Sequence, residues 1–130
     1  MAGEPILVVD DNLLNQKLVL VTLRIEGYQV RAAFDATEAQ AVLQSWRPRL
    51  ILMDLQLPGL DGLELTRRLK ADPATRDIPI VAVTAFAMKG DDLRAFQAGC
   101  DGYISKPIDV RALPALVSSY LVKGPQGVHS

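Results

Sequence analysis

The sequence contains a single cysteine and a single histidine, and each scarcity excludes a class of chemistry. One cysteine, Cys100, leaves no internal disulfide and fits a reducing compartment. The histidine, His129, lies in the terminal segment GPQGVHS. The body of the chain therefore offers no histidine for a zinc site or for a serine–histidine–aspartate triad.

An excess of one charge and long apolar runs are also missing. The chain has 14 Lys and Arg residues against 15 Asp and Glu residues. Domains that bind nucleic acid usually carry a basic excess, so we expect no direct binding to DNA. No apolar run approaches the ~18 residues of a membrane span, and the first residues, MAGEPILVVDDN, do not form a signal peptide. These features predict a cytoplasmic protein without membrane contact.

The composition is otherwise that of one folded domain. Hydrophobic residues make up 49% of the 130 residues and charged residues 22%, which is ordinary for a globular domain. This length fits one domain with one core. We expect that domain over residues 1–123 and a flexible C-terminal tail over residues 124–130.

Short apolar segments alternate with segments of helical periodicity. The expected strands are 5–9, 28–33, 50–53, 78–83 and 102–105. Three of them are nearly continuous in Ile, Leu and Val, which is typical of parallel strands covered on both faces. The expected helices are 14–25, 35–46, 61–71, 91–98 and 109–121. Five strand–helix repeats predict an α/β fold, with a doubly wound parallel five-stranded sheet between two helical layers.

Individual residues mark the helices. The first helix has one apolar stripe at intervals of three and four residues, formed by Leu14, Leu18, Val21 and Ile25. Gly27 follows where a C-terminal glycine belongs, and Asp35 precedes the second helix as a candidate N-cap. Pro114 lies within the last helical pattern and is expected to kink or delay that helix.

Charged and polar residues follow four of the expected strands. Asp10 and Asp11 follow the first strand, Asp54 the third, Thr84 the fourth and Lys106 the fifth. In open α/β sheets ligands bind outside the carboxyl ends of the strands, so these groups should meet at one edge. Clustered carboxylates repel one another unless a cation neutralises them, and oxygen ligands without histidine or cysteine favour Mg²⁺. An aspartate beside Mg²⁺ and a lysine is suited to accept a phosphoryl group.

Four motifs carry a resemblance that covers residues 5–122. They are VVDDN (8–12), LILMDLQLPGLDG (50–62), VTA (83–85) and YISKP (103–107). In this order and spacing they resemble the CheY-like receiver domain of two-component response regulators. The resemblance implies a flavodoxin-like sheet of strand order 2-1-3-4-5. Residues 10–18 and 81–108 are especially similar in sequence to single-domain regulators of the DivK type and to receivers of hybrid histidine kinases.

The resemblance assigns roles to the residues at the sheet edge. It implies that Asp54 is the phosphoacceptor. It implies a Mg²⁺ site, which Mn²⁺ could also fill, formed by Asp10, Asp11, Asp54 and the backbone carbonyl of Gln56. It also implies that Lys106 pairs with the bound phosphoryl group.

Further roles concern switching and lifetime. The resemblance implies that Thr84 turns toward the phosphoryl group and that Tyr103 moves inward with it. Pro107 corresponds to a loop-shaping proline that often follows a cis bond. Gln56 and Phe86 occupy positions that tune phosphoryl lifetime, and a large side chain at Phe86 is expected to obstruct in-line water.

The favoured function is a single-domain response regulator. A histidine kinase or a phosphotransfer protein would donate the phosphoryl group, and binding to a downstream protein through residues of about 89–122 would be the output. The protein would be a monomer or a phosphorylation-promoted dimer, and no enzyme beyond its own phosphorylation and slow autodephosphorylation. Four alternatives stay open: a receiver excised from a hybrid kinase, a Mg²⁺-dependent aspartyl-phosphate phosphohydrolase, a phosphorylation-independent adaptor, and a nucleotide-binding flavodoxin-like protein. The last is disfavoured because no glycine-rich loop follows the first strand.

Overall fold

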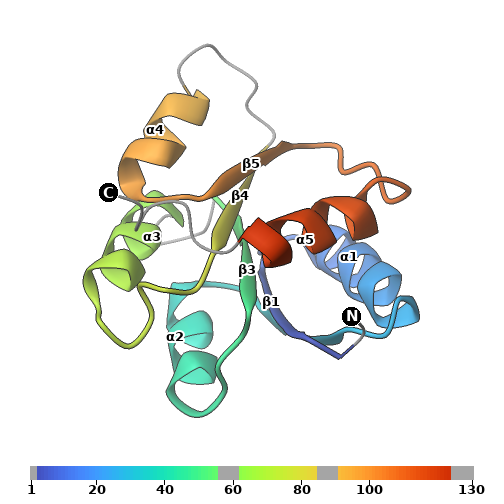
Figure 1. Cartoon of the computed structure of the whole chain (residues 1–130), viewed down its shortest axis with the longest axis horizontal. Helices are drawn as coiled ribbons and strands as arrows, with labels where there is room; N and C mark the ends of the chain where they lie inside the picture. The colour runs from blue at the N-terminus through green and yellow to red at the C-terminus, as the bar shows by residue number, and fades with distance from the viewer. Residues whose placement is uncertain (1–2, 56–61, 85–90, 124–130) are drawn as a thin grey trace.

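The fold is a five-stranded parallel sheet between two layers of helices (Figure 1). A computed structural model describes residues 3–55, 62–84 and 91–123 of the chain. The strands lie in the order β2-β1-β3-β4-β5, and every neighbouring pair is parallel. Their bounds are β1 Pro5–Val9, β2 Gln29–Ala33, β3 Leu50–Asp54, β4 Ile80–Thr84 and β5 Gly102–Ser105. Both the predicted fold class and the predicted strand order are confirmed.

Five helices cover the sheet. They are α1 Leu13–Ile25, α2 Ala36–Ser45, α3 Gly62–Ala71, α4 Asp91–Ala98 and α5 Leu113–Lys123. In Figure 1, α1 and α5 lie together on one face of the sheet, and α2, α3 and α4 lie on the other. No helix in the described ranges is long and apolar enough to cross a membrane.

The side chains of the strands alternate between two apolar clusters. Ile6 and Val8 of β1 belong to the cluster covered by α1 and α5, whereas Leu7 and Val9 belong to the opposite one. All residues of β3 and β4 are buried. Because both faces of the sheet are covered, these strands are continuous in apolar residues, and that continuity made them recognisable in the sequence.

Helix α1 is turned differently from the arrangement that its apolar stripe suggests. A stripe at this spacing normally faces the core. Here Leu14 and Ile25 are 77% and 76% exposed, and Leu18 and Val21 are each 46% exposed. The buried residues of the helix are Gln16, Val19 and Leu23. The two ends of α1 fit the sequence, because the side chain of Asn12 caps its first turn and Gly27 follows its end with a positive φ of 97°.

The expected signals at two other helices are confirmed. The side chain of Asp35 accepts a hydrogen bond from the N–H of Glu38 and thereby caps α2. Helix α5 begins only at Leu113, which places Pro114 in the first turn. Proline is tolerated there because the N–H that it lacks would have no intrahelical partner. The proline therefore delays the helix.

A buried ion pair joins α3 to the segment before β5, at the end of the sheet opposite the strand-end carboxylates. The ammonium group of Lys70 lies 2.8 Å from Oδ2 of Asp101, and the side chain of Asp101 is 0% exposed. The same oxygen accepts the N–H of Ile80 at 2.8 Å. Lys70 also donates to the carbonyls of Arg76 and Ile78. One charge pair thus fixes α3, the start of β4 and the start of β5.

Cys100 is buried, and we expect its thiol to be unreactive in the folded protein. Burial raises the pKa of this thiol to about 11, so almost no thiolate forms near pH 8. The side chain is only 4% exposed, which also blocks access. Ellman's reagent should therefore label no thiol in the native protein and one thiol in urea. Rapid labelling of the native protein at pH 8 would contradict this burial.

Candidate functional site

Three carboxylates converge at the carboxyl edge of the sheet. Asp10 and Asp11 follow β1, and Asp54 ends β3. Each offers one oxygen within 4.8 Å of the oxygens of the other two. β1 and β3 are adjacent and pair Val9 with Met53, so parallel pairing brings the residues that follow to the same level. The predicted convergence of these three side chains is confirmed.

Lys106 completes the cluster. Its Nζ atom donates to Oδ2 of Asp54 at 3.1 Å and lies 3.5 Å from Oδ2 of Asp10. Its backbone N–H donates to the carbonyl of Thr84 at 2.7 Å, which anchors the lysine to the end of β4. The lysine is therefore held by its backbone on one strand while its side chain reaches across to two others. The ammonium group offsets part of the negative charge.

The carboxyl group of Asp10 has a raised pKa. Burial raises the pKa of its carboxyl group above the ordinary value, and the charge of Asp54 raises that pKa further. The N–H of Asn12, which donates to Oδ1 of Asp10 at 2.8 Å, and the charge of Lys106 lower it, but the net direction is upward. Asp10 and Asp54 are only 4% and 2% exposed, whereas Asp11 is exposed. The site is thus an acidic cluster that is buried at Asp10 and Asp54 and exposed at Asp11.

Thr84 and Tyr103 lie on the neighbouring strands. Thr84 ends β4 and is 2% exposed, and it pairs with Ser105 of β5. Tyr103 is half-buried and packs against the apolar cluster below α2, α3 and α4. Thr84 therefore lies at the edge of the sheet that holds the carboxylates, and Tyr103 lies on the next strand, on the face covered by α2, α3 and α4.

Gly62 brings the start of α3 against the backbone of Asp54. A Cβ atom at this position would lie 2.3 Å from the carbonyl oxygen of Asp54, which no real side chain tolerates. The N–H of Gly62 donates to the carbonyl of Leu55 at 3.2 Å. The glycine is needed for this close approach of α3 to the end of β3.

Two further polar residues support the site and were not predicted from the sequence. Gln16 is buried in α1, and its amide donates to the carbonyls of Asp10 and Ala33, both at 3.1 Å. Asn12 binds Asp10 through its N–H and caps α1 through its side chain. The N-cap preference of asparagine was a usable signal. Gln16 gave none, because its burial depends on the rotation of α1.

The remaining predicted site residues are Pro107, Gln56 and Phe86. The peptide bond between Lys106 and Pro107 is cis, as the resemblance implied. Gln56 and Phe86 lie outside the described residues. Their expected roles in metal binding and phosphoryl lifetime therefore stay predictions.

The donor set fits a hard divalent cation. Three carboxylate oxygens lie close together, with no sulfur or imidazole ligand among them. Oxygen ligands of this kind suit Mg²⁺ and also Mn²⁺. A single lysine cannot neutralise three carboxylates, and the charge of Asp54 adds to the effect of burial in raising the pKa of Asp10. A divalent cation would offset the remaining negative charge.

The fold and this cluster define an open parallel α/β protein with an acidic site at the carboxyl edge of its sheet. The sequence profile of the response regulator receiver domain matches residues 6–118. The chain is 47% identical over 116 residues to the polar-differentiation response regulator DivK of Brucella anthropi, which covers 89% of this chain and 94% of that relative. The chain belongs to the response regulator receiver family.

Solved structures agree with this membership. The receiver domain of the sensor histidine kinase PA1611 from Pseudomonas aeruginosa, which was solved with a magnesium ion in its active site cleft, matches with a TM-score of 0.84 and 37% identity. The match covers 93% of this chain and 99% of that domain. A receiver domain of a histidine kinase from Syntrophus aciditrophicus matches with a TM-score of 0.85 and 31% identity, covering 93% of this chain and 92% of that one. The protein is therefore a receiver domain similar to DivK, in a family whose members are generally not enzymes in the usual sense.

Proposed function

We propose that this chain is a cytoplasmic single-domain response regulator that accepts a phosphoryl group on Asp54. A histidine kinase or a histidine phosphotransfer protein donates it. The observation that carries the proposal is the position of the Asp54 carboxylate, which contacts Lys106 and lies close to the carboxylates of Asp10 and Asp11. We take residues 1–123 as the receiver unit and 124–130 as its tail. The chain is similar to DivK over nearly the full length of that regulator, which agrees with this proposal.

The transfer reaction requires one nucleophile and charge compensation. An oxygen of Asp54 attacks the phosphorus of a phosphohistidine, a P–O bond forms, and the P–N bond breaks. The imidazole nitrogen leaves with the electron pair and takes a proton from water. Lys106 already contacts Asp54 and is placed to follow the developing charge on the phosphoryl oxygens.

Asp10 and Asp11 are the residues that would hold Mg²⁺ together with Asp54, and Gln56 is expected to add its backbone carbonyl. When bound, the ion supplies charge stabilisation for the transferring phosphoryl group. Without it, the carboxylates repel the incoming anionic group. We therefore expect phosphorylation to require Mg²⁺ or Mn²⁺.

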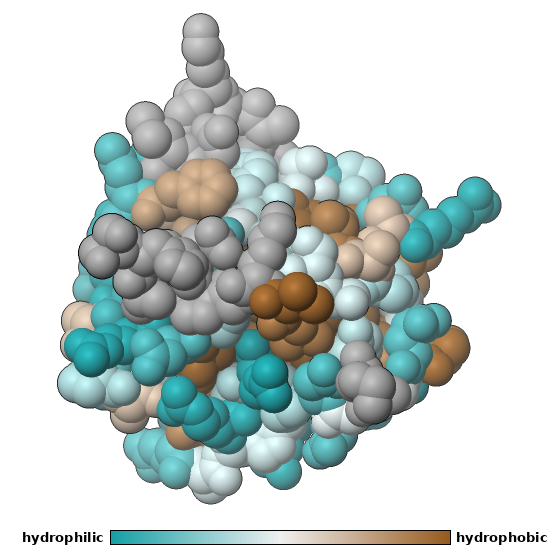
Figure 2. All heavy atoms as spheres, in the orientation of Figure 1, coloured by the Kyte–Doolittle hydropathy of each residue, from teal (hydrophilic) through white to brown (hydrophobic). Residues whose placement is uncertain are grey.

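Thr84 and Tyr103 transmit phosphorylation of Asp54 to the surface that binds the downstream protein. Thr84 turns toward the phosphoryl group, and Tyr103 moves further inward with it, which changes the surface formed by residues of about 89–122. Phe96 of α4 and Leu116 of α5 are 48% and 37% exposed there. Figure 2 shows brown apolar atoms over α4 and α5, set among hydrophilic ones. This surface binds a downstream protein, or a second copy of the chain, in the phosphorylated state.

A direct test of the proposal is the intact mass of the protein after incubation with acetyl phosphate and Mg²⁺. We expect one added phosphoryl group per chain, lost again by slow hydrolysis. Catalytic turnover of a simple phosphomonoester, such as p-nitrophenyl phosphate, would instead favour the phosphohydrolase alternative. Absence of any added phosphoryl group would favour the adaptor.

The exposed apolar stripe on α1 supports docking of the donor protein next to the site. Leu14, Leu18, Val21 and Ile25 lie on one helix that begins directly after the carboxylates, because Asn12 links Asp10 to the first turn. Helix α1 contains basic residues but no acidic ones between Leu13 and Ile25. A donor helix with an apolar stripe and acidic flanks therefore fits this surface.

Changing the stripe should slow transfer from a protein donor but not from a small molecule. In Leu14→Asp, with a side chain that is 77% exposed in the parent protein, we expect transfer from a phosphorylated histidine phosphotransfer domain to slow by roughly tenfold or more. Labelling by acetyl phosphate should stay unchanged, because it needs no docking. Rates are measured by loss of label from the donor.

Phe96→Asp is the matched control, since Phe96 is also an exposed apolar residue and lies on α4, on the other face of the sheet (Figure 1). It should leave both reactions unchanged. Equal slowing in the two variants, or no slowing in Leu14→Asp, would show that the α1 stripe is not the docking surface.

A further inference from the structure

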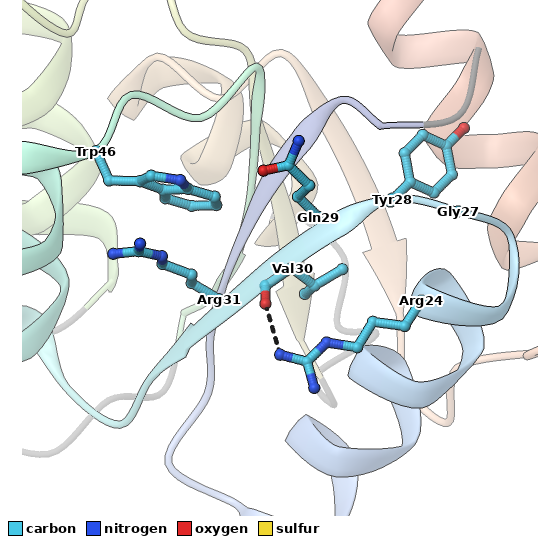
Figure 3. Close-up of a pocket in the computed structure, with 7 residues that line it drawn as sticks. All are labelled: Arg24, Gly27, Tyr28, Gln29, Val30, Arg31 and Trp46. Carbon is cyan, nitrogen blue, oxygen red and sulfur yellow. Dashed lines mark hydrogen bonds between the residues drawn. The ribbon is translucent and has the colours of Figure 1, made fainter.

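A hollow lies at the free edge of β2, separate from the carboxylate cluster (Figure 3). Its volume is about 430 Å³, which is within the range of small-molecule sites. It is lined by Arg24, Gly27, Tyr28, Gln29, Val30, Arg31 and Trp46. The lining thus includes two guanidinium groups and the single tryptophan of the chain, and no carboxylate.

The edge of β2 turns its backbone toward this hollow at Val30. Gln29 donates its N–H to Glu4, and Ala33 accepts from Asp10, so these residues face β1. In a parallel strand alternate residues point to opposite sides, and Val30 therefore directs its N–H and C=O outward. Arg24 donates to this carbonyl at 3.0 Å. Arg24 thereby covers the edge against pairing with another strand and is itself held in place.

The second guanidinium group is fixed by the tryptophan. The guanidinium carbon of Arg31 lies 4.8 Å from the ring centroid of Trp46, in a cation–π contact. Figure 3 shows Arg31 on β2 beside Trp46, whereas Arg24 reaches from α1 to the carbonyl of Val30. Neither arginine forms an ion pair within the described part of the chain.

The charge of the hollow is uneven along its length. Glu4 and Glu26 act on Tyr28, and the pKa of that phenol is raised by burial first and then by these two carboxylates. Tyr28 lies at the end of the hollow away from Arg31 and Trp46 (Figure 3). The negative charge of these two carboxylates therefore acts at the Tyr28 end of the hollow, away from Arg31 and Trp46.

We propose that this hollow binds a nucleotide. The planar pair of Arg31 and Trp46 offers a surface on which an aromatic base stacks, and guanidinium groups are common stacking partners of bases. Arg24, further along the edge, offers donors for the phosphate. The separation of a stacking surface from a phosphate donor distinguishes a nucleotide from inorganic phosphate. This site does not depend on Asp54.

Energy transfer from Trp46 gives a direct test. Because Trp46 is the only tryptophan, its emission can excite a bound nucleotide that carries an N-methylanthraniloyl group on the ribose. The labelled probe is ADP, titrated into the full chain in EDTA, with the Asp54→Asn variant alongside. We expect a saturable signal of equal affinity in both proteins. No saturable signal in either would overturn the proposal.

Variants separate the site from general attraction to positive charge. Arg24→Ala and Arg31→Ala should each weaken binding about tenfold or more, because the first removes a charge-assisted contact and the second removes part of the stacking surface. Arg67→Ala, an exposed arginine on α3, should not change it. Arg24→Lys keeps the charge and guards against loss of folding, and it should still weaken binding. Unchanged affinity in the Arg24 and Arg31 variants would refute the site.

Competition identifies which part of the ligand is recognised. Unlabelled ADP should displace the probe at far lower concentrations than either adenosine or inorganic phosphate. Displacement by inorganic phosphate at the same concentrations as ADP would reduce the hollow to a simple anion site and overturn the nucleotide assignment.

Discussion

Replacement of Asp54 by asparagine should abolish phosphorylation by acetyl phosphate. The amide has the shape of the carboxylate but carries no negative oxygen to attack phosphorus, so no acyl phosphate can form. Wild-type protein with Mg²⁺ should gain the mass of one phosphoryl group, and Asp54→Asn should gain none. The measurement is intact mass spectrometry before hydrolysis has advanced.

The variant is informative because it should remain folded. Asp54 is 2% exposed and lies among like charges, and its charge helps to raise the pKa of Asp10. Removing that charge relieves repulsion, so the melting temperature should be unchanged or higher. Asp77→Asn, at an exposed carboxylate, is the control and should be phosphorylated normally. A phosphoryl group that still appears on Asp54→Asn would place the acceptor elsewhere.

Among the proposed substitutions, replacement of Asp101 by alanine should cause the largest decrease in the free energy of unfolding. Removing one partner of a buried ion pair costs about 3–5 kcal/mol, because the other charge is left buried without compensation. Lys70 would keep its two carbonyl contacts but lose the carboxylate at 2.8 Å. The N–H of Ile80 would also lose its acceptor. We expect this loss in urea unfolding at neutral pH.

The control for this variant is Asp77→Ala, which removes an exposed carboxylate from the same region of the chain. Exposed substitutions of this kind usually change stability by less than about 0.5 kcal/mol. Phosphorylation of folded Asp101→Ala should proceed as in the wild type, since the ion pair lies at the opposite end of the sheet. A stability loss equal to that of the control would show that the pair contributes nothing.

The sequence alone determined the order of the elements and the place of the site. Strands such as Leu50–Asp54 are recognisable because burial on both faces requires an apolar residue at every position. Parallel strands bring their carboxyl ends to one edge, so Asp10, Asp54 and Lys106 could be assigned to a common site without coordinates. Local chemistry likewise fixed the cap at Asp35 and the delayed start of α5 at Pro114.

Only the tertiary structure decided which way α1 is turned and which contacts are made over long sequence distances. The stripe from Leu14 to Ile25 has helical spacing whichever side it faces, and the buried position of Gln16 follows from packing on β1 and β2. The pairing of Lys70 with Asp101, 31 residues away, leaves no periodic trace either. Periodicity records that a helix has two unlike faces, whereas the choice between them depends on the shape and polarity of the surface that it meets.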